Sequence, residues 1–176
     1  MLSLILIGLV LIVVAVLLIA RQPDSFRVER SLQVAAPVDV LFAQVNDLHN
    51  WEQWSPWAKR DPQMLKVYEG PPAGVGALYR WAGNKEVGEG SLSIVDSQAH
   101  EQIRFQLTFL RPFKANNDVL FRFIAEGADT RVSWSMSGRN TFISKAVHLV
   151  MDMDTLCGGD FERGLAQLKA VAEARP

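Results

Sequence analysis

The fold of this chain is decided by its last long stretch, Thr141–Arg175, which reads TFISKAVHLVMDMDTLCGGDFERGLAQLKAVAEAR. Large apolar residues recur along it at steps of three to five, close to the helical period, and charged residues lie between them. The apolar positions are Phe142, Ala146, Leu149, Met153, Leu156, Phe161, Leu165, Leu168 and Val171. The pattern predicts a long C-terminal amphipathic helix that supplies the seed of a core.

Two features of the stretch modify this helix. Asn140 or Thr141 can cap its first turn, because their side-chain oxygens accept from free backbone N–H groups. Gly158-Gly159 interrupts the helical pattern and is followed by Asp160, another good cap. Either the helix bends at the glycines, or another backbone packs there too closely for side chains.

The amino-terminal end differs from the rest of the chain. Leu2–Ala20 carries no charge and would reach about 28 Å as a helix, close to the hydrocarbon thickness of a bilayer. A cleaved signal peptide normally has a basic start and a small-x-small cleavage site, and both are missing here. We therefore predict a retained transmembrane anchor over residues 1–21, a linker over 22–25 and one domain over 26–176. The arginines after the span favour a cytoplasmic domain at the membrane surface.

The domain begins with a strand and continues through short helices. Phe26–Val34 alternates apolar and polar residues, with Arg30 as the one misfit on the apolar side. Pro37 is well placed to open a helix, and apolar residues recur at helical spacing through Asn46. A second short helical or looped piece then carries Trp51, Trp54 and Trp57.

Strand patterns follow one another up to the C-terminal helix. They are residues 64–69, 76–82, 89–96, 103–109, 119–125 and 130–138. Short connections between consecutive strands imply antiparallel neighbours, and one-sided alternation implies one buried face. We predict an α+β fold in which a curved antiparallel sheet of about seven strands closes around the long C-terminal helix.

The composition excludes several classes of function. The net charge is −1, and the 18 basic and 19 acidic residues are mixed along the chain, so no nucleic-acid surface is expected. The single cysteine, Cys157, excludes an intramolecular disulfide. His49, His100 and His148 are far apart and lack a second ligand type at metal spacing, so neither a metal nor a cofactor is predicted.

The order of elements resembles the helix-grip fold of the START-like (SRPBCC) superfamily, and specifically its polyketide cyclase/dehydrase and lipid-transport branch. The resemblance covers about Phe26–Glu173. It is carried by Ala36-Pro37, Asn46-Asp47-Leu48, Trp51-x-x-Trp54-Ser55-Pro56-Trp57, Gly74-x-Gly76, Gly88-x-Gly90, Thr130-x-Val132-x-Trp134 and Asp160-Phe161-Glu162-x-Gly164-Leu165. Members of the superfamily bind lipids, quinones, hormones and polyketides between sheet and helix, and some are enzymes, so the fold alone does not select a function.

The candidate site residues are the aromatic and methionine side chains expected on the inner face of the sheet and helix. They are Trp54, Tyr79, Trp81, Phe105, Phe123, Trp134, Met136 and Met153. Each has a competing interpretation as ordinary core. Cys157 is interpreted as a small core residue. Arg30 is interpreted as lying near a sheet edge, with a ligand carboxylate or phosphate as the alternative if it points inward.

These observations predict a membrane-tethered module that binds a hydrophobic small molecule, lipid or isoprenoid-like, with no catalytic residues assigned. Two alternatives remain open. One is a cyclase/dehydratase-type enzyme acting on an apolar polyketide-like substrate, which needs an acid/base pair at the cavity. The other is a scaffold or interaction domain whose cavity is filled by side chains. The sequence identifies no protein partner.

Overall fold

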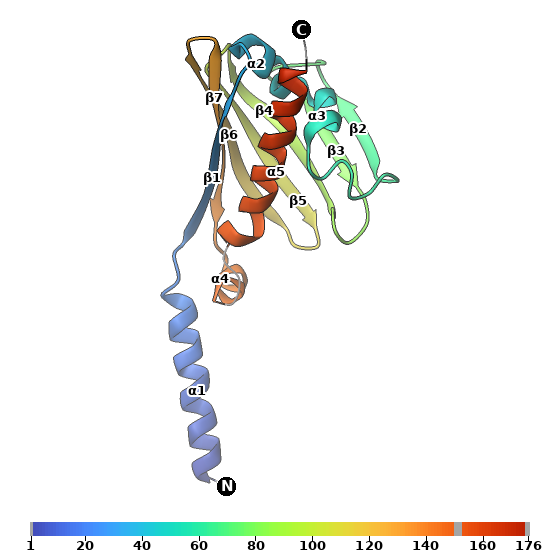
Figure 1. The fold of residues 1–176 in the computed structure, drawn as a ribbon. Helices are drawn as coiled ribbons and strands as arrows, with labels where there is room; N and C mark the ends of the chain where they lie inside the picture. The colour runs from blue at the N-terminus through green and yellow to red at the C-terminus, as the bar shows by residue number, and fades with distance from the viewer. Residues whose placement is uncertain (1, 150–152, 175–176) are drawn as a thin grey trace.

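The computed structural model describes residues 2–149 and 153–174. Its first element is the helix α1 (Leu2–Ala20), which projects away from the domain (Figure 1). Within the described part of the chain, no helix combines the length and the apolar character that crossing a membrane requires. The predicted transmembrane anchor is therefore not supported, and the predicted localisation as a single-pass membrane protein is wrong by this criterion.

The described residues form a single seven-stranded antiparallel sheet in the order β1-β7-β6-β5-β4-β3-β2. Consecutive strands from β2 to β7 are neighbours, as the short connections predicted, and β1 closes the sheet beside β7. The strands are β1 (Ser25–Val34), β2 (Leu65–Glu69), β3 (Leu78–Ala82), β4 (Glu89–Gln98), β5 (Gln102–Arg111), β6 (Ala115–Glu126) and β7 (Asp129–Arg139). The predicted α+β architecture is confirmed, with several strands longer than predicted.

Short helices connect β1 to β2. They are α2 (Val38–Asn46), the 3₁₀ turn η1 (Leu48–Asn50) and α3 (Trp51–Trp54). The C-terminal stretch forms α4 (Phe142–His148) and α5 (Met153–Glu173), and Thr141 caps α4 by accepting from the N–H of Ser144. Figure 1 shows α5 lying along the concave face of the sheet, with β2 and β3 to one side of it. We call the face toward α5 the inner face.

The helix α5 runs through Gly158-Gly159 without a break, and the second alternative, close packing at the glycines, holds in part. The side chain of Arg30, not a backbone, explains Gly158. A Cβ atom at Gly158 would lie 2.1 Å from Nη2 of Arg30, which is far inside van der Waals contact. Between α4 and α5, residues 150–152 lie outside the described part of the chain.

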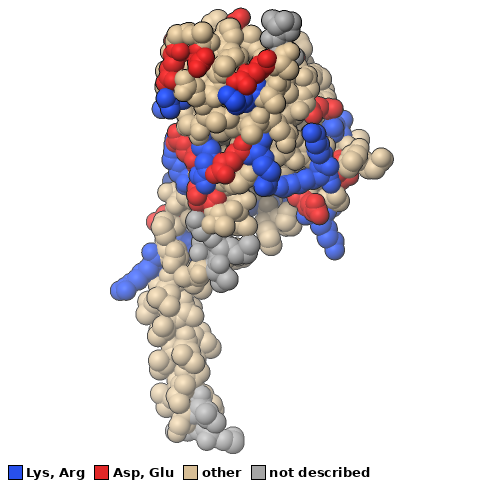
Figure 2. Space-filling view, viewed as in Figure 1, with Lys and Arg blue, Asp and Glu red and all other residues tan. Residues whose placement is uncertain are grey.

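Arg30 joins the edge strand β1 to α5. Its Nη1 and Nη2 each donate to Asp154 at 2.7 Å, and its Nε donates to Glu162 at 2.7 Å. The interpretation of Arg30 as a residue at a sheet edge therefore holds. Its partners are carboxylates of this chain, so the structure gives no need for an anionic ligand there. Figure 2 shows basic and acidic side chains lying next to one another on this face of the domain.

Candidate functional site

The inner face of the sheet has two parts that differ in how fully they are covered. The first, which we call the closed half, lies beneath α5 and α3 and centres on Trp134 of β7. The Trp134 indole stacks on Phe161 of α5 with ring centroids 4.3 Å apart and on Phe121 of β6 with centroids 4.8 Å apart. The edges of Trp51, Trp54 and Trp57 surround it. The closed half is a packed aromatic core.

Five of the eight predicted pocket residues lie in the closed half or beside it in the same core. These buried residues are Trp54, Phe105, Phe123, Trp134 and Met136. Trp54 is fully enclosed, and its Nε1 donates to the backbone carbonyl of Gln44 at 3.2 Å. These five side chains pack together, as the residues of an ordinary core do. Trp134 differs in one respect: among the described residues, its buried Nε1 has no hydrogen-bond partner.

The second part, which we call the open half, lies over β2, β3 and the adjoining end of β4 and β5. Tyr79, Trp81 and Met153 are the three predicted pocket residues that are only partly buried. Tyr79 and Trp81 are two apart on β3, so both project from the same face of the strand. Leu107 of β5 and Cys157 of α5 are also partly buried against the core. The open half therefore keeps apolar surface available.

Aromatic rings in the open half form a continuous stack, which we call the aromatic ladder: His49, Tyr68, Tyr79 and Trp81. Successive ring centroids are 4.1 Å, 5.1 Å and 5.7 Å apart, and each pair is stacked. The cross-strand pairing of Tyr68 with Tyr79 places their rings side by side. The faces of Tyr68 and Tyr79 are covered by their neighbours in the stack, so the row presents ring edges, which suit edge-to-face contact with an elongated or planar apolar compound.

Gly90 on β4 fixes the end of the ladder. It pairs with Trp81, and a Cβ at Gly90 would lie 2.6 Å from Cζ2 of the indole. The Trp81 ring therefore lies across the glycine, and its Nε1 donates to the carbonyl of Val87 at 3.0 Å. Gly88 has a φ of +67°, as a turn requires, whereas Gly90 makes room for a ring.

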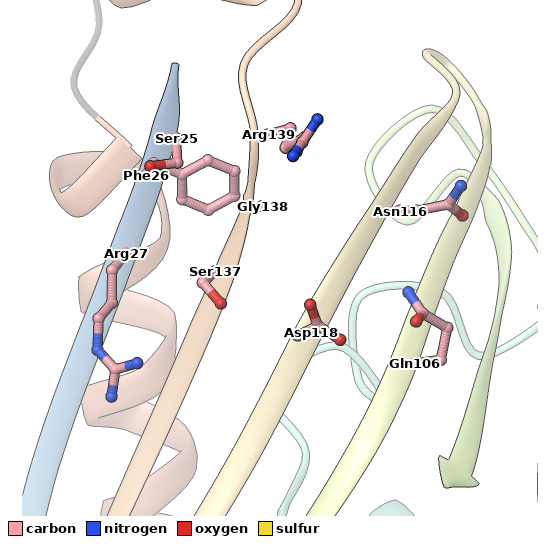
Figure 3. A pocket seen from close by; sticks show the side chains of 9 residues that line it. All are labelled: Ser25, Phe26, Arg27, Gln106, Asn116, Asp118, Ser137, Gly138 and Arg139. Carbon is pink, nitrogen blue, oxygen red and sulfur yellow. The ribbon is translucent and has the colours of Figure 1, made fainter. Parts of the chain in front are cut away.

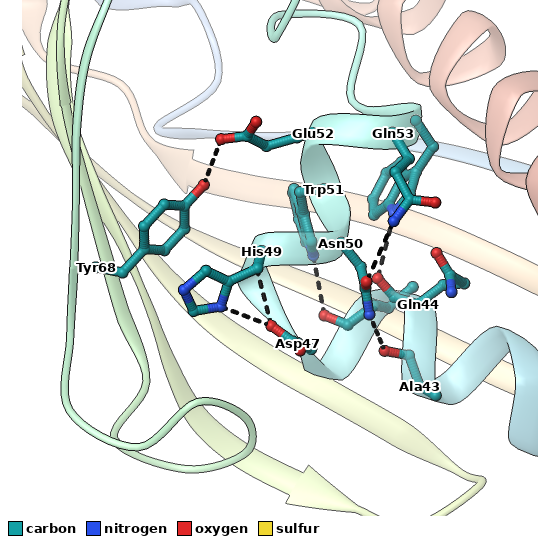
Figure 4. A network of polar contacts seen from close by, with 11 residues as sticks. Ala43, Gln44, Asp47, His49, Asn50, Trp51, Glu52, Gln53 and Tyr68 are labelled. Atoms are coloured by element: carbon teal, nitrogen blue, oxygen red, sulfur yellow. Dashed lines mark hydrogen bonds and ion pairs between the residues drawn. The ribbon is translucent and has the colours of Figure 1, made fainter.

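Polar side chains border the other end of the ladder (Figure 4). The Tyr68 hydroxyl donates to Oε1 of Glu52 at 3.0 Å, and Lys66 donates to the same oxygen at 3.1 Å. His49 Nδ1 lies 2.9 Å from Oδ1 of Asp47. The sequence pattern singled out none of Glu52, Lys66 or Tyr68, and His49 was considered there only as a possible metal ligand.

Burial and hydrogen bonding alter the acidity of these groups. Burial raises the pKa of Tyr79 to about 12. Burial, followed by the hydrogen bond to Glu52, raises the pKa of Tyr68 above its ordinary value. The bonds from Lys66 and then Tyr68 lower the pKa of Glu52. At neutral pH both tyrosines are therefore neutral phenols and Glu52 is a carboxylate.

Cys157 of α5 is partly buried against the core. Burial, and after it the nearby carboxylates of Asp160 and Asp154, raises the pKa of its thiol to about 11. The thiol is therefore protonated at neutral pH and a poor nucleophile, in line with its interpretation as a small apolar residue. Within the described residues, no group of three or more histidine, cysteine or carboxylate side chains is placed to hold a metal ion.

A separate hollow of about 760 Å³ lies on the outer face of the sheet (Figure 3). Arg27, Ser137, Asp118 and Gln106 form one row across β1, β7, β6 and β5 on its floor. Most of the residues that line it are polar, and Arg27 is already paired with Glu29 at 2.7 Å. This hollow does not match the apolar ligand predicted from the sequence.

Comparison with known proteins identifies the family of this chain. The sequence profile of the family described as polyketide cyclase / dehydrase and lipid transport matches residues 25–173. The chain belongs to this family. A comparison with curated proteins finds no match. The family resemblance and the helix-grip fold predicted from the sequence are thus confirmed.

Solved structures of the same fold have low sequence identity to this chain. The Zhui aromatase/cyclase from a Streptomyces species aligns with a TM-score of 0.62 at 14% identity, over 86% of this chain and 95% of its own. Protein MLL2253 from Mesorhizobium loti gives 0.63 at 14%, over 86% and 99%. Aha1 from Colwellia psychrerythraea, solved as a dimer, gives 0.62 at 13%, over 85% and 97%. At these identities the likeness shows the fold alone.

Proposed function

We propose that this protein binds a hydrophobic small molecule on the open half of the inner face, along the aromatic ladder. The observation that carries the proposal is the incomplete coverage of Tyr79 and Trp81. Both lie on the inner face, stack on each other and stay partly exposed, whereas the closed half is filled by its own side chains. The family description, which names polyketide and lipid chemistry, supports an apolar ligand.

The apolar area of the ladder that a ligand covers determines how strongly the ligand can bind. Removing apolar surface from water contributes roughly 25 cal/mol per Å², and aromatic stacking adds about 0.5–1.5 kcal/mol per ring pair. A ligand that contacts Tyr79 and Trp81 is stabilised both by the burial of apolar surface and by aromatic contact. Leu107 of β5 lies opposite Leu92, which lies opposite Tyr79, so these side chains extend the same apolar face.

Binding can be tested with naphthol, a flat apolar probe, and the full chain. Replacing Trp81 with Leu removes the last ring of the ladder and is expected to weaken probe binding about tenfold, the equivalent of ~1.4 kcal/mol. Phe113→Leu is the matched control, since Phe113 is 75% exposed and lies outside the ladder. Equal affinity in wild type and Trp81→Leu would refute the location. Mass spectrometry of organic extracts of the purified protein would identify the class of natural ligand.

A cyclase-type or dehydratase-type activity is the second candidate function. The observation that favours it is the placement of Asp47–His49 and Glu52–Tyr68 at one end of the ladder, because such chemistry needs acid/base groups next to the ligand. The Zhui aromatase/cyclase and the di-domain ARO/CYC BexL have this fold, which agrees with this possibility.

A further inference from the structure

The pair Asp47–His49 is arranged so that one carboxylate oxygen holds the histidine at two points. Oδ1 of Asp47 accepts from the backbone N–H of His49 at 2.9 Å and lies 2.9 Å from Nδ1 of its ring. An ionised carboxylate can only accept hydrogen bonds, so the facing Nδ1 carries the proton. The lone pair of the neutral imidazole is then on Nε2, the nitrogen turned away from Asp47 in Figure 4.

The position of the ring is fixed as well as its tautomer. The imidazole stacks on Tyr68 with centroids 4.1 Å apart, and the half-exposed side chain remains in reach of solvent. It is therefore the outermost ring of the aromatic ladder. A ligand lying along the ladder would place its end at this imidazole.

The other titratable groups around His49 are already engaged with one another. Lys66 and Tyr68 of β2 both donate to Glu52 of α3, and Tyr79 of β3 lies behind Tyr68 in the stack. Among the described residues, nothing forms a hydrogen bond with Nε2 of His49. That atom is therefore the basic position of this cluster that is open to a ligand.

We propose that His49, oriented by Asp47, is a general base for a planar ligand bound along the aromatic ladder, an inference that rests on the proposed binding function. Nε2 removes a proton from an acidic carbon of the ligand. The electron pair of the broken C–H bond forms a new π bond as a leaving group departs with its own bonding pair. Asp47 stabilises the imidazolium that results, and the proton passes from it to water.

Nitrobenzisoxazole tests this step directly, because it is flat, apolar and opens when a base removes its single ring C–H proton beside nitrogen. The C–H pair forms a nitrile, the N–O bond breaks, and a coloured cyanophenolate is released. We expect saturable turnover by the full chain. His49→Gln is expected to lower kcat by at least about tenfold, at the lower end of general-base contributions, whatever change in KM follows from the loss of its ring.

Companion variants separate the base from a structural role. Asp47→Asn is expected to lower kcat less than His49→Gln and to change the pH profile of kcat, because the amide can stabilise either tautomer. His100→Asn is the matched control, since His100 is an exposed histidine outside the ladder and its φ of 63° suits asparagine. Its kcat is expected to equal that of the wild type.

The outcomes distinguish the inference from the function on which it rests. Saturable binding with the same kcat in wild type and His49→Gln would overturn the general base and leave ligand binding intact. A loss in Glu52→Gln as large as in His49→Gln would assign the base to the carboxylate and likewise overturn it. Absence of saturation, together with no effect of Trp81→Leu on naphthol binding, would overturn both.

Discussion

The indole of Trp134 on β7 packs directly against Gly164 of α5. A Cβ atom at Gly164 would be 2.6 Å from Cζ3 of the indole and 3.2 Å from Cδ of Pro56. The indole cannot move aside, because it is stacked between Phe121 and Phe161. This contact sets how closely the helix approaches the sheet in the closed half.

Replacing Gly164 with Ala is therefore expected to destabilise the protein. Alanine favours the helix by about 1 kcal/mol over glycine, whereas overpacking a rigid core site costs typically 1–3 kcal/mol. The net expectation is a free energy of unfolding lower by about 1–2 kcal/mol, measured by urea denaturation. Gly159→Ala is the control in the same helix, because nothing lies nearer to its Cβ than Nη1 of Arg163 at 3.7 Å. It should be stabilised by up to ~1 kcal/mol, and a stabilised Gly164→Ala would contradict the close contact.

The Arg30–Asp154 pair predicts a pH-dependent stability. The hydrogen bond from Arg30 lowers the pKa of Asp154, so the folded protein binds this proton less readily than the unfolded chain does. The stabilisation is fully present above the ordinary carboxyl pKa of about 3.9 and is lost as pH falls through the lower folded value. Asp154→Asn should thus unfold at lower urea than wild type at pH 7, and the difference should shrink below about pH 4.

Glu101→Gln is the control for this titration. It removes an exposed carboxylate that forms no ion pair among the described residues. Its urea midpoint should follow that of the wild type at every pH. A difference between Asp154→Asn and wild type that grows as the pH is lowered would show that the pair does not act through this ionisation.

The two tyrosines of the chain predict an alkaline transition. Burial raises the pKa of Tyr79 to about 12 and also raises the pKa of Tyr68. A phenol whose folded pKa is raised holds its proton more tightly in the fold, so stability is lost as pH rises from about 10, the unfolded value. Ultraviolet titration should show little tyrosinate in the folded protein at pH 10. A tyrosine that ionises there without unfolding would refute its burial.

Much of the fold could be predicted because local sequence patterns indicate its strands and helices. Alternation gave each strand, and the apolar period of residues 141–175 gave the helix that the sheet surrounds. The role of the glycines in α5 could not be predicted, because a glycine pair is also typical of a helix break. Gly158 instead leaves room for the side chain of Arg30, which lies on a strand 128 positions earlier in the sequence. No local pattern carries information about a contact of that kind.

The site was harder to predict for a related reason. Inner-face residues such as Trp54 and Trp81 follow the same alternation or helical spacing, and only the path of α5 decides which is enclosed and which stays open. Glu52 and Tyr68 meet only because β2 folds beside α3. The polar end of the ladder therefore has no signature in the sequence beyond the neighbours Asp47 and His49.

The central claim is that ligand binds along the ladder and not within the closed half. Fluorotryptophan labelling gives each of the five tryptophans its own fluorine NMR signal, assigned by single Trp→Phe variants. On titration with naphthol, we expect the Trp81 signal to shift while those of Trp54 and Trp134 stay in place. A shift of Trp134 with none at Trp81 would contradict it, since the ligand would then lie in the closed half beside the unpaired indole N–H.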